Sequence, residues 1–128
     1  MSKGRGFVRL LKDNEGSTAV EFALVALLFI GMLFAGISAS RLGYSAASLH
    51  FASEAAARCR AMGTTCSDPS TTQTYALGRF HNIAGQTPSF VSDTPSCGNR
   101  VTGTLNYSFG WVLGSQIVPL SSTACFPS

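Results

Sequence analysis

The chain has 128 residues, 45% of them hydrophobic, and a formal net charge of +3. This length suits one domain, and because much of the apolar content lies in one stretch, only a modest water-facing core remains. The first 16 residues carry a net charge of +2, and the other 112 are close to neutral. Nucleic-acid binding needs Lys and Arg clustered on a folded face, so this distribution argues against a nucleic-acid partner.

Residues 22–40 form an uncharged apolar stretch, FALVALLFIGMLFAGISAS. At about 1.5 Å per residue, a helix of this length spans about 28 Å, close to the thickness of a bilayer's hydrocarbon core. Four basic residues precede this stretch, Lys3, Arg5, Arg9 and Lys12, and one, Arg41, lies directly after it. The positive-inside rule therefore places the N-terminus in the cytoplasm. We therefore predict a single membrane span followed by an exported C-terminal part.

The sequence EGSTAVEF at residues 15–22 places a carboxylate at the start of this span. Glu21 can simply mark the cytoplasmic edge of the membrane, where a carboxylate reaches headgroups and water. However, the basic leader, Gly16 and Glu21 five positions later together resemble the class III signal peptide of type IV pilin-like proteins. That resemblance implies that a prepilin peptidase cuts between Gly16 and Ser17, which makes Glu21 the fifth residue of the mature chain.

Two short pieces narrow the resemblance: AVEF at residues 19–22 and EAAAR at residues 54–58. With the apolar run between them, they resemble the TadE-like pseudopilins of tight adherence (Tad) systems, over about the first half of the chain. The segments CGNRVTGTLNYSF and VPLSSTACFP resemble the exported part of the same group.

The TadE-like resemblance implies a minor pseudopilin that helps to assemble or anchor a Tad/Flp-type IV pilus for surface adherence. Its expected partners are the membrane, the prepilin peptidase, other pilins or pseudopilins and the pilus assembly platform. It also implies a place in the inner (cytoplasmic) membrane with a periplasmic head, or an extracellular place within a pilus. Glu21 and Phe22 would set the register of assembly, with the Glu21 carboxylate paired to the new α-amino group of a neighbouring subunit, since an unpaired buried carboxylate is costly.

Two other interpretations of the apolar stretch stay open. An ordinary signal peptidase could cut near Ile37-Ser38-Ala39 and release a soluble binding domain from about Ser40. The apolar stretch is longer than the usual 7–15 residues of a signal peptide, and this interpretation leaves Glu21 unexplained, so we rank it second. A permanently anchored interaction protein would instead keep its leader.

Helical character continues beyond the span. Between Arg41 and Met62 there is no proline, and apolar or small residues recur at helical spacing: Leu42, Ala46, Leu49, Ala52, Ala55, Ala56 and Cys59. We expect one helix over residues 17–60. Five small residues repeat every four positions and would let another helix approach closely: Gly31, Ala35, Ala39, Gly43 and Ala47. We call these five residues the small-residue ladder, although small residues are also common in any membrane span.

The remaining sequence predicts a small head. Gly63-Thr64-Thr65 ends the long helix. A short amphipathic helix follows, capped by Thr71 or Thr72, with a buried stripe of Tyr75, Ala76, Phe80, Ile83 and Ala84. Period-two alternation then predicts strands at residues 90–93, 101–109 and 117–126, with a connection at 110–114. The predicted fold class is α+β: a leader at 1–16, a transmembrane and stalk helix at 17–62, and a head at 63–128 with an antiparallel sheet of about three strands.

Four cysteines, Cys59, Cys66, Cys97 and Cys125, all follow the span. In an oxidising compartment disulfides are expected, and a small head with a thin core has reason to use them. We favour Cys59 with Cys66 and Cys97 with Cys125, although the sequence alone leaves three pairings open. A zinc site that adds His50 or His81 is a weaker alternative, because no Cys-x2-Cys or paired-His spacing is present.

Catalysis finds little support in the sequence. His50 is expected on the stalk helix and His81 on the short helix, and neither accompanies a recognisable nucleophile motif. The acidic residues Glu54, Asp68 and Asp93 are scattered, and no glycine-rich loop suited to phosphate is present. We therefore expect a protein without enzymatic activity, cofactor or metal.

Overall fold

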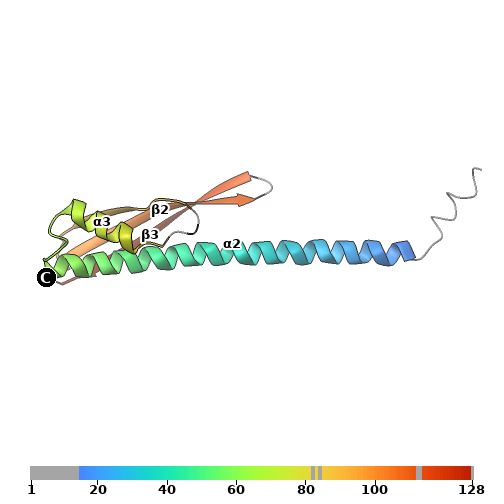
Figure 1. Ribbon diagram of the computed structural model, residues 1–128, viewed down its shortest axis with the longest axis horizontal. Helices are drawn as coiled ribbons and strands as arrows, with labels where there is room; N and C mark the ends of the chain where they lie inside the picture. Colours follow the sequence, from blue (N-terminus) through green and yellow to red (C-terminus); the bar gives the residue numbers. More distant parts are fainter. Residues whose placement is uncertain (1–14, 82, 84, 112–113, 128) are drawn as a thin grey trace, which may run out of the picture. The chain divides into compact units, whose positions relative to one another are not determined.

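The computed structural model describes residues 15–81, 83, 85–111 and 114–127 (Figure 1). Five elements follow one another along the chain: α2 (Glu15–Met62), α3 (Pro69–Arg79), β1 (Ser89–Asp93), β2 (Asn99–Trp111) and β3 (Gly114–Phe126). The α+β class, with a long apolar helix, a short helix and a three-stranded antiparallel sheet, is confirmed. The chain divides into two compact units, before and after the boundary between Ile37 and Ser38, and we describe each by itself.

Helix α2 is continuous over 48 residues, as the proline-free sequence predicted. Gly63 ends it, also as predicted: its φ of 68° lies in the left-handed region that glycine adopts at little cost. The Gly63 N–H donates to the Arg60 carbonyl oxygen at 3.2 Å, which satisfies one of the last carbonyls of the helix.

The first unit contains α2 up to Ile37, and its large apolar side chains are exposed. Each retains 48–76% of its accessible surface, and they are Val20, Phe22, Leu24, Val25, Leu27, Leu28, Phe29, Ile30, Met32, Leu33, Phe34 and Ile37. A helix that is apolar on all sides is stable only when lipid or other protein covers it. The first unit therefore requires such an environment.

The second unit is built on an antiparallel sheet of order β1-β2-β3. Strands β2 and β3 pair along their whole length, from Asn99↔Phe126 to Trp111↔Gly114. Both are longer than predicted, because Gly110 and Trp111 continue the pairing into the expected connection. Strand β1 pairs only with the first part of β2, from Asp93↔Arg100 to Ser89↔Thr104.

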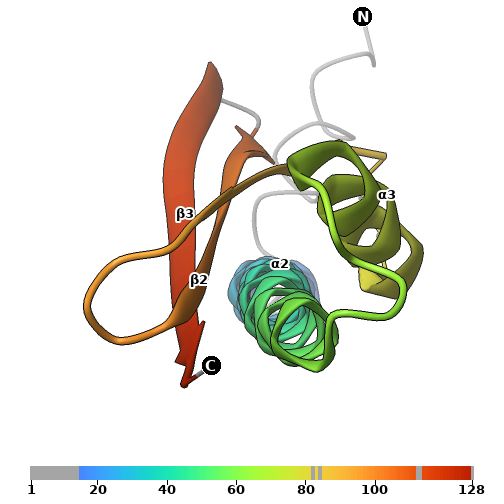
Figure 2. The same ribbon diagram turned by 90° about the vertical axis from the view of Figure 1, so that its left-hand side faces the viewer.

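The core lies between the sheet and the last turns of α2, and Figure 2 shows the sheet and α3 around the end of that helix. Its buried apolar residues are Leu49, Ala52, Ala56 and Ala57 of α2, Ala76 of α3, and Phe90, Val101, Leu105 and Ala124 of the sheet. Two buried serines on the same helix face are satisfied locally: Ser45 Oγ donates to the Arg41 carbonyl at 3.0 Å, and Ser53 Oγ donates to the Leu49 carbonyl at 2.9 Å.

Gly103 allows α2 to approach the sheet closely. A Cβ atom at this position would lie 2.7 Å from Phe90 Cε1, 2.8 Å from Ser53 Oγ and 3.0 Å from Leu49 Cδ1. These distances are shorter than carbon contacts at optimal separation. The alternation Val101, Gly103, Leu105 thus places a residue without a side chain where the helix and strand meet.

The short helix differs from the prediction in three details. It begins at Pro69, with Asp68 as its N-cap, so the prediction of Thr71 or Thr72 as the cap is wrong. Thr71 Oγ1 instead accepts a hydrogen bond from the Asp68 N–H at 3.2 Å. The helix ends at Arg79, so His81 lies beyond it, and Ile83 is 54% exposed rather than buried. Ala84, the last residue of the expected stripe, lies outside the described residues.

Candidate membrane and assembly helix

The predicted cleavage point, between Gly16 and Ser17, falls in the first turn of α2. Both residues are exposed, and among the described residues outside the local helix no heavy atom lies within 4 Å of a Cβ built on Gly16. The first four N–H groups of a helix have no partner within it, so its first turn opens more readily than its interior. In the described part of the chain, nothing outside the helix covers the Gly16–Ser17 peptide.

Glu21 and Phe22 lie one turn further along α2, and both are exposed. Within the part of the chain that the structure describes, the ion pairs are His50–Glu54 and Arg100–Asp93, so none involves Glu21. A carboxylate next to an exposed apolar helix can be kept charged by water, by headgroups or by a cation from another chain. The described part of the chain thus supplies this carboxylate without an ion-pair partner for it.

The apolar part of α2 is long and apolar enough to cross a membrane. Within the described residues, none of its most apolar stretch of 18 residues is buried. The core helix of a soluble protein would be largely covered, so the composition and exposure together fit a membrane anchor.

The five residues of the small-residue ladder are all exposed. No heavy atom outside the local helix lies within 4 Å of a Cβ built on Gly31 or Gly43. At the C-terminal end of the ladder, Gly43 and Ala47 are exposed, whereas Ser45 and Leu49 are buried in the core. Because Ala47 lies two residues from each of these buried positions, it projects from the opposite side of the helix. The sheet therefore leaves this end of the ladder uncovered.

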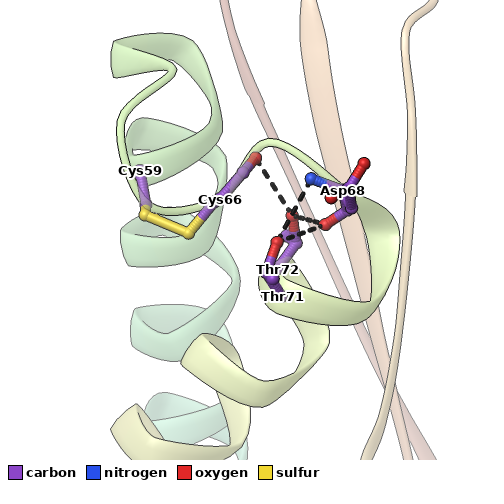
Figure 3. The surroundings of a disulfide bond; sticks show 5 residues. All are labelled: Cys59, Cys66, Asp68, Thr71 and Thr72. Atoms are coloured by element: carbon purple, nitrogen blue, oxygen red, sulfur yellow. Dashed lines mark hydrogen bonds between the residues drawn. A yellow bond between two sulfur atoms is a disulfide. The ribbon is translucent and has the colours of Figure 1, made fainter.

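Two disulfides bind the parts of the second unit together, Cys59–Cys66 and Cys97–Cys125. These are the pairings favoured from the sequence. Figure 3 shows Cys59–Cys66 beside the start of α3, where the Thr72 hydroxyl donates to the Asp68 carbonyl at 2.8 Å. Both cysteines of this bridge are buried, whereas Cys97 is exposed. The first bridge fixes the end of α2, and the second joins the β1–β2 loop to the end of β3.

Arg60 links the end of α2 to the sheet, a role that the sequence analysis missed. Its Nη1 donates to Ser92 Oγ at 2.6 Å, and its Nε donates to Asn99 Oδ1 at 3.3 Å. The nearby Arg100 Nε donates to Asp93 Oδ1 at 2.8 Å, and Arg100 Nη2 also contacts Asp93 Oδ2. The hydrogen bond from Arg100, helped by the charges of Arg100 and Arg60, holds the pKa of the Asp93 carboxyl below its usual value. The sequence did contain a signal for this role: helical spacing puts Arg60 on the same face of α2 as the buried residues Ser53 and Ala56.

The two histidines have different contacts. His50 Nδ1 is 3.8 Å from Glu54 Oε1 on α2, and the His81 N–H donates to Ser48 Oγ at 2.8 Å. In the described part of the chain, no three His, Cys, Asp or Glu side chains gather in a way that could hold a metal ion.

Comparison with known proteins bears on the first part of α2, which contains the apolar stretch, the ladder, Gly16 and Glu21. The family model described as TadE-like protein matches residues 16–58. This segment is TadE-like. The match confirms the resemblance stated from the sequence over these residues; it begins at Gly16, contains Glu21 and the ladder, and ends just before Cys59. No curated protein and no solved structure matches the chain.

Proposed function

We propose that the protein is a minor pseudopilin that takes part in assembling or anchoring a Tad/Flp-type IV pilus for surface adherence. The observation that carries this proposal is the TadE-like segment, which coincides with an exposed apolar helix. The protein would act by helix packing rather than by catalysis. Its partners would be other pilins or pseudopilins and the assembly platform of the pilus.

In this proposal a prepilin peptidase removes residues 1–16 on the cytoplasmic side of the inner membrane. The accessible first turn of α2 supports cleavage between Gly16 and Ser17. The chain stays anchored by residues 22–40, with the second unit in the periplasm. The two disulfides of that unit fit an oxidising compartment.

Glu21 would set the register between subunits. Its carboxylate lies at the start of an uncovered apolar helix, so packing of that helix against a neighbour favours an arrangement in which a cation meets the charge. The α-amino group created by cleavage on the neighbouring chain is such a cation. The ladder would let the two helices approach closely enough for this contact.

The experiment that tests this proposal uses cells in which the full chain replaces the native copy. In the Glu21→Gln variant we expect normal removal of the leader and a loss of surface pili. Glu54→Gln is the matched control, because Glu54 lies on the same helix beyond the span and should leave pili unchanged. Normal piliation in the Glu21→Gln variant would refute the register role, and unchanged pili in cells without the protein would refute the pilus function.

A further inference from the structure

The end of the β2–β3 hairpin lies beside the helix residues at which the apolar stretch ends. A polar groove of about 370 Å³ is lined by Ser38 and Arg41 of α2 together with Phe109 and Gly110 of β2. All four residues belong to the second unit. Ser38 is among the last residues of the uncharged stretch 22–40, and Arg41 is the first charged residue after it. The hairpin end therefore lies beside the residues at which the expected span ends.

Charge is distributed unevenly along the sheet. Arg100 and Asp93 face each other at the start of β2, whereas residues 101–128 contain no charged side chain. Phe109 is nine residues from Arg100 along β2, a distance of about 30 Å at 3.3–3.4 Å per residue. The sheet thus has a charged end, distant from the groove, and an uncharged end beside Arg41.

Apolar side chains are exposed at this uncharged end. Ile117 of β3 is 67% exposed, and Ile83, which also lines the groove, is 54% exposed. Single exposed apolar residues are ordinary on a protein surface, but Ile83 lines the groove and Ile117 pairs with Ser108, which lines it too. An arginine at the end of a membrane span can donate to lipid phosphates. The single tryptophan of the sequence, Trp111, is the last residue of β2.

We propose that the uncharged end of the hairpin, residues 108–111 and 114–118, is a second membrane-contact surface that rests in the headgroup layer of the exported leaflet. Arg41 in the adjacent groove contacts lipid phosphates. The occupant of this surface is a phospholipid bilayer, because the groove beside it contains Ser38 and Arg41, the residues at which the expected span ends. The proposal rests on residues 22–40 crossing the membrane and is independent of leader cleavage and of pilus assembly.

Trp111 provides an intrinsic probe of this contact. The full chain is placed in phospholipid vesicles, and its fluorescence is measured with lipids brominated near the glycerol end of the acyl chain, with lipids brominated near the bilayer centre, and with aqueous acrylamide. We expect strong quenching by the shallow bromolipids, weaker quenching by the deep ones, and protection from acrylamide. Alkaline extraction of the same vesicles reports separately whether the span is inserted.

Two variants with matched exposure make the test specific. Ile117→Glu adds a charge at the hairpin end and should lower the quenching by shallow bromolipids and raise that by acrylamide. Val91→Glu is the control, because Val91 is 64% exposed and pairs with Thr102 near the charged end of the sheet, so quenching should not change. The absence of free thiols in both variants verifies that both disulfides have formed.

Other results would overturn the inference. Full quenching by acrylamide without bromolipid quenching, in chains that resist alkaline extraction, would place the hairpin in water while leaving the span intact. Protection from both quenchers that disappears on dilution of the protein in lipid would show that a second copy, rather than lipid, covers this surface. Normal leader removal and piliation in cells that carry the unaltered chain would leave the proposed function standing in either case.

Discussion

The large apolar side chains of residues 16–37 are 48–76% exposed, whereas Leu49 and Val101 in the second unit are at most 1% exposed. Both regions share α2, so the difference does not arise from secondary structure. It arises because a sheet of the same chain covers the C-terminal part of the helix. The N-terminal part would be covered only by lipid or by another chain. The first region should therefore respond to changes in its partners, and the second to changes in its own packing.

The largest effect on the second unit should come from removing its disulfides. A bridge constrains the unfolded chain more when it closes a longer loop, and the sequence separations are 28 for Cys97–Cys125 and 7 for Cys59–Cys66. We expect the paired Cys→Ala variants to lower the free energy of unfolding by about 3–4 and about 2–3 kcal/mol respectively. Urea unfolding of the full chain in detergent micelles, followed by circular dichroism, measures both. A larger loss from the short loop would show that native packing around the buried bridge outweighs chain entropy.

A smaller loss of folding free energy should follow when a larger residue crowds the contact between α2 and β2. Gly103→Ala adds a methyl group that meets Ser53, Leu49 and Phe90, and overpacking of this kind costs about 1–3 kcal/mol. Gly110→Ala is the matched control on the same strand, since a Cβ there has no heavy atom within 4 Å. The same urea experiment should separate the two, and equal stability would contradict the close approach.

Variants of the first region should change contacts between subunits rather than the stability of the second unit. Replacing Gly31 and Ala35 by Leu should weaken crosslinking between subunits in the membrane and leave the unfolding of the second unit unchanged, because both ladder residues are exposed. Gly36→Leu is the control, since Gly36 is equally exposed on the same helix but lies off the ladder. Unchanged crosslinking in the double variant would show that the ladder does not mediate contact between subunits.

The smallest effect concerns the charged end of the sheet. Because the folded pKa of Asp93 lies below the unfolded value of about 3.9, the unfolded chain binds more protons there. The stabilisation is complete above the unfolded pKa and is lost as the pH falls through the folded pKa. Asp93→Asn should therefore reduce stability slightly at pH 5 to 7 and converge with the parent at lower pH. Arg100→Gln should have the same effect, and a loss that grows as the pH falls would contradict the assignment.

The elements with strong periodic signals could be predicted from the sequence. Residues 17–60 lack proline and residues 101–109 alternate, so the long helix and the central strand followed directly. The exact ends of the strands could not be predicted, because the pairing of Gly110 and Trp111 with β3 depends on a register that composition does not encode. The Arg60 bonds to Ser92 and Asn99 join residues 32 and 39 positions apart and were missed for the same reason. The roles of Gly16 and Glu21 were predicted through a family resemblance alone, and they stay predictions.

We propose above all that α2 enters the membrane as the mature start of a pseudopilin. The most direct test is the N-terminal sequence and intact mass of the protein from membranes of cells with and without a prepilin peptidase. We predict a chain that begins at Ser17 when the peptidase is present and keeps its leader when it is absent. A soluble chain that begins near Ser40, or an intact leader in both strains, would contradict the account.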